Sequence, residues 1–134
     1  MIWLPAVLWM AVIFTVSSIP DVGAMPGGFA DSTLHGAEYL VLSALLVRAI
    51  ARAEWRCVTW RTALAALAAS TAYALTDEWH QSFVPGRASE WRDVVSDAAG
   101  SSVAAGGAWA WSIIRHFSRS RERRHGVHEP PPRA

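Results

Sequence analysis

Residues 76–93, TDEWHQSFVPGRASEWRD, hold a dense group of ionisable side chains between stretches rich in alanine, valine and tryptophan. They are Asp77, Glu78, His80, Arg87, Glu90, Arg92 and Asp93. A histidine beside a carboxylate can act as a general base, and an arginine can fork two hydrogen bonds to a phosphate. A solvated loop could carry the same residues without any function. Their chemistry therefore depends on whether water or hydrocarbon surrounds the segment.

The composition favours a membrane protein with one domain. The chain has 134 residues, of which 52% are apolar and 17% charged, and its mean hydropathy is +0.20. A small soluble domain usually needs fewer apolar residues. The single cysteine, Cys57, excludes an intrachain disulfide and a cysteine-based metal cluster.

Four apolar stretches predict an all-α, polytopic fold with four transmembrane helices. Their approximate bounds are 2–18, 34–51, 62–83 and 93–114, each near the roughly 20 residues that cross a bilayer core. The first lacks a basic start and a small-residue cleavage site, so a span is favoured over a cleaved signal peptide. Residues 115–134 are polar, rich in arginine and end in prolines, and they predict a disordered tail.

The distribution of arginine predicts the orientation. All 12 basic residues are arginine. Arg48, Arg52, Arg56 and Arg61 flank the connection between the second and third spans, and six more arginines lie at or beyond Arg115. The positive-inside rule places both regions in the cytoplasm. With four spans, both termini are then cytoplasmic, and we expect a multi-pass protein of the cytoplasmic membrane.

This topology brings polar residues from three spans to one depth, just below the outer face. Spacings of three and four residues place those of each span on one helix face. The predicted functional residues are His35, Glu38 and Tyr39 on the second span, Asp77, Glu78 and Gln81 on the third, Asp93 and Asp97 on the fourth, and Arg87 on the loop as their counter-charge. Carboxylates facing lipid are costly, so these faces should meet one another or a water-filled recess.

Rows of small residues predict where the helices pack, because such rows let backbones approach closely in lipid. The predicted rows are Ser96, Gly100, Ala104 and Ala108 in the fourth span, and Ala65, Ala68, Ala69 and Ala72 in the third. Trp79 and Trp91 bracket the outer loop and suit an interfacial aromatic belt.

The chain resembles the VanZ-like family of small bacterial membrane proteins over roughly residues 10–107. The resemblance is carried by Asp77, Glu78, Gln81, Phe83, Pro85, Gly86, Arg87, Asp93, Asp97 and Gly100, by Asp31, His35 and Tyr39 upstream, and by Ser17, Ser18 and Pro20. Ser32 stands where family members often carry lysine, and Asp97 where they often carry asparagine. Both departures make the predicted recess more acidic than is usual for the family.

The resemblance implies a role at the bacterial cell envelope. The name-giving members are associated with tolerance to the glycopeptide antibiotic teicoplanin, which acts on cell-wall precursors outside the membrane. No reaction is securely attached to the family. The resemblance therefore implies the architecture more strongly than an activity.

Three functions remain open on the sequence alone. The recess binds the head group of a lipid or lipid-linked envelope precursor; or it is the site of a membrane-embedded hydrolase or transferase; or its charges only hold three helices in register. For an enzyme, His35 with Glu38, or His80 with Asp77, would supply a base and its orienting carboxylate. The chain contains neither a zinc helix of the H-E-x-x-H type nor a nucleophile elbow. We expect membrane lipids as partners, and no cofactor, metal or nucleic acid.

Overall fold

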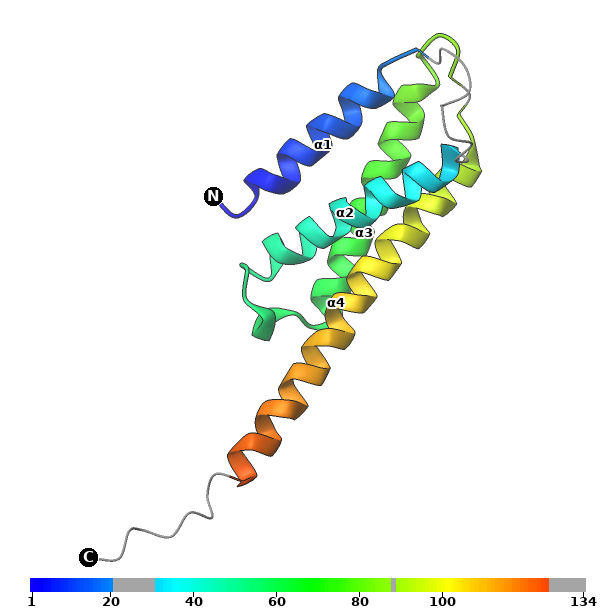
Figure 1. Ribbon diagram of the computed structural model, residues 1–134. Helices are drawn as coiled ribbons and strands as arrows, with labels where there is room; N and C mark the ends of the chain where they lie inside the picture. The colour runs from blue at the N-terminus through cyan, green and yellow to red at the C-terminus, as the bar shows by residue number, and fades with distance from the viewer. Residues whose placement is uncertain (21–30, 88, 126–134) are drawn as a thin grey trace, which may run out of the picture.

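The computed structural model describes residues 1–20, 31–87 and 89–125, without the side chains of residues 31, 32, 55 and 119–125. This part of the chain is all-helical, as predicted: α1 spans Leu4–Ser17, α2 Asp31–Ile50, α3 Trp60–Gln81 and α4 Trp91–His125, with a short 3-10 turn, η1, at Trp55–Cys57. Successive helices run in alternating directions (Figure 1). The end of α1, the start of α2, the end of α3 and the start of α4 therefore lie at one end of the bundle.

Local sequence explains where α3 begins and ends. Thr59 and Thr62 form a reciprocal cap, in which each hydroxyl accepts a hydrogen bond from the other residue's backbone N–H at 3.3 Å. The helix ends at Gln81, shortly before Pro85 and Gly86. Gly86 has a φ of 80°, a conformation that glycine adopts without strain. The chain can thus reverse within a short connection and enter α4.

The helices α2 and α4 approach most closely where two glycines face each other. A Cβ added to Gly100 would overlap the carbonyl oxygen of Gly36, and a Cβ added to Gly36 would lie 2.8 Å from Ser96 Oγ. Ala104 and Ala108 continue this row and are half-buried. The predicted small row of the fourth span therefore lies in a helix contact, and Gly36 is its partner on α2.

The predicted small row of the third span is wrong. Its members, Ala65, Ala68, Ala69 and Ala72, are exposed, whereas the buried positions of the same stretch are Ala63, Ala66, Ser70 and Ala74. Alanine occupies so many positions of this helix that small size alone does not identify the inner face. The polar residues Ser70, Asp77 and Gln81, all buried, do identify it.

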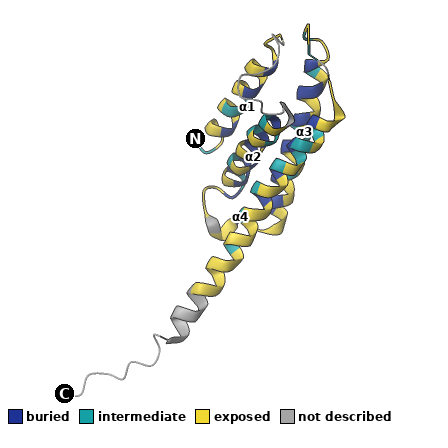
Figure 2. Ribbon diagram, turned by 45° about the vertical axis from the view of Figure 1, so that its right-hand side comes forward, coloured by how far each residue is buried: buried dark blue, intermediate teal, exposed yellow. Residues whose placement is uncertain are grey.

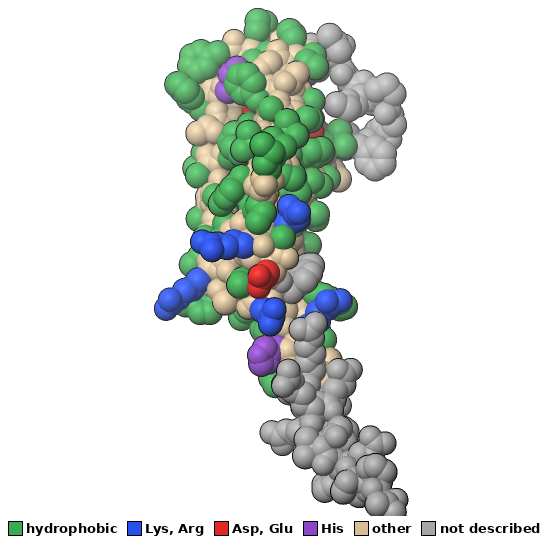
Figure 3. Space-filling model, turned by 90° about the vertical axis from the view of Figure 1, so that its left-hand side faces the viewer, with side chains coloured by type: hydrophobic (Ala, Val, Ile, Leu, Met, Phe, Trp, Pro, Cys, Tyr) green, Lys and Arg blue, Asp and Glu red, His purple; other side chains and the backbone are tan. Residues whose placement is uncertain are grey.

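The outside of the bundle is largely apolar. Exposed side chains cover the outward faces of the helices (Figure 2) and include Leu64, Leu75 and Val103. On the face shown in Figure 3, hydrophobic side chains dominate the upper part of the molecule. Basic side chains gather in the lower part of the described residues. Within the described residues, Thr33–Ile50 is the one segment both long and apolar enough to cross a membrane, and Leu4–Ser17 is a shorter apolar helix.

The last helix is longer than predicted. α4 continues beyond the expected end of the fourth span at Ile114 as far as His125. Arginine and glutamate are good helix formers, and no glycine or proline interrupts the sequence before Gly126. The rest of the expected tail, residues 126–134, lies outside the described residues.

Candidate functional site

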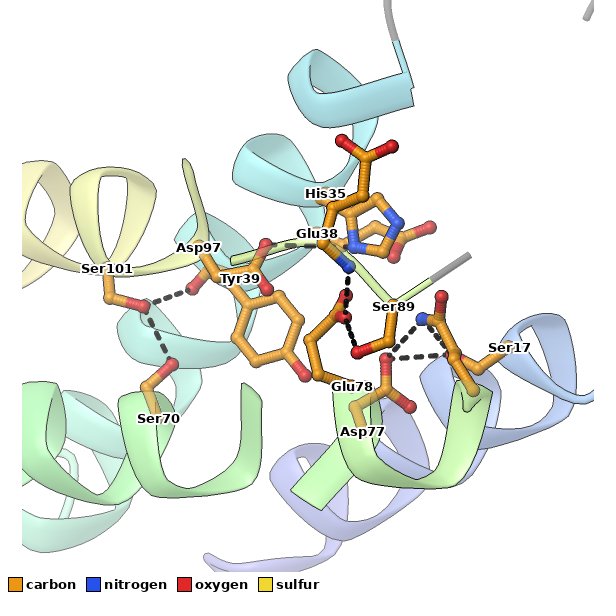
Figure 4. Close-up of polar contacts among 12 residues, drawn as sticks. Ser17, His35, Glu38, Tyr39, Ser70, Asp77, Glu78, Ser89, Asp97 and Ser101 are labelled. Carbon is orange, nitrogen blue, oxygen red and sulfur yellow. Dashed lines mark hydrogen bonds and ion pairs between the residues drawn. The ribbon is translucent and has the colours of Figure 1, made fainter. Parts of the chain in front are cut away.

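Eight polar side chains from α2, α3 and α4 lie together near one end of the bundle, and we call them the polar cluster. Its members are His35, Glu38, Tyr39, Asp77, Glu78, Gln81, Asp93 and Asp97, and Figure 4 labels all of them except Gln81 and Asp93. All are buried except Glu38, which is half-buried. The helix faces predicted from three- and four-residue spacing thus do point inward.

The two carboxylates of α3 are each held through one oxygen. Asp77 Oδ2 accepts hydrogen bonds from Ser17 Oγ at 2.8 Å and from Gln81 Nε2 at 3.1 Å, which joins α1 to α3. Glu78 Oε2 accepts from Ser89 Oγ at 2.9 Å and from the backbone N–H of Glu90 at 3.0 Å. The orientation of both carboxylates is therefore fixed by the helix end and by the loop that follows it.

His35 and Asp97 link α2 to α4. The Nδ1 atom of His35 lies 3.8 Å from Oδ1 of Asp97, close enough for an ion pair but too long for a hydrogen bond. In Figure 4 the two side chains point toward each other, with the ring of Tyr39 beside them. The sequence had suggested Glu38, one turn away on the same helix, as the partner of His35. The ion pair seen here is instead with another helix.

The polar cluster contains several buried atoms without a hydrogen-bond partner. Within the described residues these are His35 Nδ1, Tyr39 Oη, Asp77 Oδ1, Glu78 Oε1 and Asp97 Oδ1. A buried polar group without a partner costs on the order of 1–3 kcal/mol. Native proteins leave few such groups, and here they lie on three neighbouring helices.

Arg87 lies on the loop between α3 and α4 and reaches toward α1. Its Nε donates to the carbonyl of Ile19 at 3.2 Å, and its Nη2 donates to the carbonyl of Val16 at 3.3 Å. These carbonyls belong to the end of α1, where a cation is favoured by the helix dipole. Arg87 therefore links the loop to the end of α1.

A family model for VanZ/LLP1 matches residues 2–115. The chain belongs to the VanZ/LLP1 family. The match extends beyond the 10–107 range of the resemblance and covers all four helices as far as the start of the arginine-rich end of α4. No curated protein and no solved structure matches the chain.

The second histidine suggested as a base in this VanZ/LLP1 protein, His80, contacts α1. His80 stacks on Phe14 at 4.5 Å between ring centroids, and its Nε2 lies 3.0 Å from Ser18 Oγ. Ser18 Oγ also donates to the carbonyl of Phe14 at 2.7 Å. The contacts of His80 with Phe14 and Ser18 join α1 to α3.

The described residues contain no group of three or more histidine, cysteine, aspartate or glutamate side chains placed to hold a metal ion. The carboxylates of the cluster are instead spread over α2, α3 and α4.

Sequence reasoning missed a serine network just below the cluster. Ser101 Oγ lies 2.8 Å from Ser70 Oγ and donates to the carbonyl of Tyr39 at 3.4 Å, while Ser43 Oγ donates to the carbonyl of Ser101 at 2.9 Å. All three serines are fully buried. They link α2, α3 and α4 by hydrogen bonds, one of which holds the backbone carbonyl of Tyr39. Isolated serines in apolar spans were the available signal, since such residues often bond across helices.

Proposed function

We propose that all four helices cross the cytoplasmic membrane, with both termini on the cytoplasmic side and the polar cluster just below the outer face. The alternating helix directions support this topology (Figure 1). So does the position of Arg48, Arg52, Arg56 and Arg61, around the connection at the end of the bundle opposite the cluster. The apolar exterior supplies the surface that lipid would cover.

Thiol labelling tests this topology. Cys57 is exposed on the α2–α3 connection, and Phe83 is 69% exposed at the other end of the bundle. In intact cells, a membrane-impermeant maleimide should label Phe83→Cys made in a Cys57→Ser background, and should leave Cys57 of the wild type unlabelled until the cells are permeabilised. Labelling of Cys57 in intact cells would reverse the proposed orientation.

The polar cluster, on this proposal, binds the head group of a lipid or lipid-linked envelope precursor and so affects tolerance to envelope-directed, teicoplanin-type glycopeptides. The observation that carries the proposal is the set of five buried polar atoms without partners, drawn from three helices. Hydrogen bonds fix the second oxygen of Asp77 and of Glu78. The free oxygens are therefore held in place before any ligand arrives, which lowers the entropy cost of binding.

A head group would reach the cluster past the loop that follows α3. Ser89 and Glu90 are exposed, and their two hydrogen bonds to Glu78 close the loop over the cluster. Moving this short segment aside uncovers Glu78 without disturbing the contact between Gly36 and Gly100. The binding site then opens toward the outer leaflet, where lipid-linked envelope precursors are exposed.

The competing interpretation, a purely structural charge network, makes a different prediction about Tyr39. A structural network gains nothing from a hydroxyl that has no partner, so its removal should leave the protein equally or more stable. A binding site loses a contact to its ligand when the same hydroxyl is removed. Tyr39→Phe therefore separates the two interpretations.

We expect Tyr39→Phe to keep its fold but to retain roughly 2- to 10-fold less co-purified lipid than the wild type. This is the effect of losing one hydrogen bond. Tyr73→Phe is the matched control, because Tyr73 Oη donates to the carbonyl of Met10 at 2.7 Å. The control should lose stability and keep its lipid. Native mass spectrometry measures retention, and thermal unfolding in detergent measures stability. Unchanged lipid retention in Tyr39→Phe, with stability equal or higher, would favour the structural network.

A further inference from the structure

The charge of the polar cluster restricts what it can bind. Its carboxyl groups are those of Glu38, Asp77, Glu78, Asp93 and Asp97, against one histidine, His35. A phosphate placed among these carboxylates would meet like charge, which is strongly unfavourable away from water. A cation would instead offset the negative charge of these carboxylates. The excess of acidic side chains is one indication that the cluster binds a cation. The buried polar atoms without a hydrogen-bond partner are a second, independent indication.

The partnerless atoms are mainly acceptors. Three of them are carboxylate oxygens, on Asp77, Glu78 and Asp97, and these side chains are 5%, 5% and 1% exposed. A cation beside a carboxyl group favours its ionised form, which only accepts hydrogen bonds. Another partnerless atom is the hydroxyl oxygen of Tyr39, whose ring lies between Asp97 and Glu78 in Figure 4. A ligand that satisfies this arrangement must bring several donors.

We infer that the group entering the cluster is a primary ammonium carried by a membrane lipid, rather than its phosphate. This inference rests on the proposed function and names the ligand chemistry of the same site. A primary ammonium carries a positive charge and three N–H donors, which match the carboxylate oxygens of Asp77 and Glu78 that have no hydrogen-bond partner. A bare divalent cation fits less well, because no group of three acidic or histidine side chains among the described residues is placed to hold one.

Glu78→Gln is the sharpest variant for this inference. Oε2 of Glu78 accepts from Ser89 and from the Glu90 N–H, while Oε1 is the partnerless oxygen. The carbonyl oxygen of glutamine can keep both accepted bonds, and its NH₂ then replaces the free acceptor. The change therefore converts an acceptor for the ammonium into a donor and leaves the loop attached. Glu90→Gln removes the same charge from an exposed side chain of the same loop and serves as the control.

The experiment is a lipid competition read by native mass spectrometry. The full-length protein is equilibrated in detergent with equal amounts of phosphatidylethanolamine, phosphatidylcholine and phosphatidylglycerol that share the same acyl chains. Phosphatidylcholine keeps the positive charge but has no N–H donor, and phosphatidylglycerol has no ammonium. We expect the wild type and Glu90→Gln to retain phosphatidylethanolamine about tenfold better than either, as for a charge-assisted hydrogen bond, and Glu78→Gln to lose that preference. Added glycerophosphoethanolamine tests whether the head group alone competes.

The outcomes separate the two proposals. Equal retention of the three lipids, or a preference for phosphatidylglycerol, overturns the ammonium inference. If Tyr39→Phe still lowers lipid retention in that case, the proposed function stands without it. If the wild type retains none of the three lipids, and a total envelope lipid extract gives no bound species either, both proposals fall. A preference for phosphatidylethanolamine that survives Glu78→Gln overturns the assignment to this cluster.

Discussion

Gly100→Ala is expected to lower the free energy of unfolding by about 3 kcal/mol or more and to remove most folded protein from detergent extracts. The added methyl would overlap the carbonyl oxygen of Gly36, which is backbone and cannot rotate away. Relief requires α2 and α4 to separate along their whole contact. That separation would pull His35 away from Asp97, so the polar cluster should lose its contacts between α2 and α4 when the fold is lost. Titration with a denaturing detergent, followed by circular dichroism, measures the loss.

Gly106→Ala and Gly107→Ala are the matched controls on the same helix. A Cβ added at either position meets no atom within 4 Å. Because alanine is favoured over glycine in a helix by about 1 kcal/mol, these variants should be as stable as the wild type or slightly more so. If Gly100→Ala behaved like them, the close contact between α2 and α4 would not exist as described. If all three were destabilised alike, the effect would belong to helix propensity or membrane insertion.

The sequence predicted the four helices well because hydropathy and helix breakers act locally. The expected spans 2–18, 34–51 and 62–83 differ from α1, α2 and α3 by no more than three residues at either end. The end of α4 was missed for a physical reason. A helix does not need an apolar environment to continue, and the arginine-rich sequence after Ile114 has high helix propensity.

On α3, the inner face was predictable from its polar residues and not from its alanines. Asp77 and Gln81 stand four residues apart in an apolar helix, and burial of both follows from the cost of placing them in lipid. The alanines of α3 carry no such cost on either face, so the packing row was assigned to the wrong side.

The partners within the cluster could not be predicted from spacing. Spacing along one helix suggests Glu38 for His35, but the ion pair seen here is with Asp97. That pairing depends on the rotation of α4 against α2, which the Gly36–Gly100 contact fixes. The hydrogen bond from Ser89 to Glu78 likewise depends on the path of the loop. Such details follow from tertiary packing and leave no periodic signal.

Asp97→Ala is expected to lower the free energy of unfolding by about 3 kcal/mol, because it removes one member of a buried pair and leaves the other uncompensated. Asp97 is 1% exposed and His35 is 6% exposed, and their facing atoms lie 3.8 Å apart. Neither of these atoms has a hydrogen bond within the described residues. Each side chain therefore depends on the other for electrostatic compensation. Equilibrium unfolding in a denaturing detergent measures the effect, as for Gly100→Ala.

A double-mutant cycle shows whether the two side chains act as a unit. His35→Ala should cost less in the Asp97→Ala background than in the wild type, with a coupling energy of about 1–3 kcal/mol. Glu54→Ala, which removes an exposed acid from the α2–α3 connection, should change stability by less than about 0.5 kcal/mol. Additive losses from His35→Ala and Asp97→Ala would show that the pair does not hold α2 to α4. In that case the Gly36–Gly100 contact and the serine network would have to fix the rotation of α4.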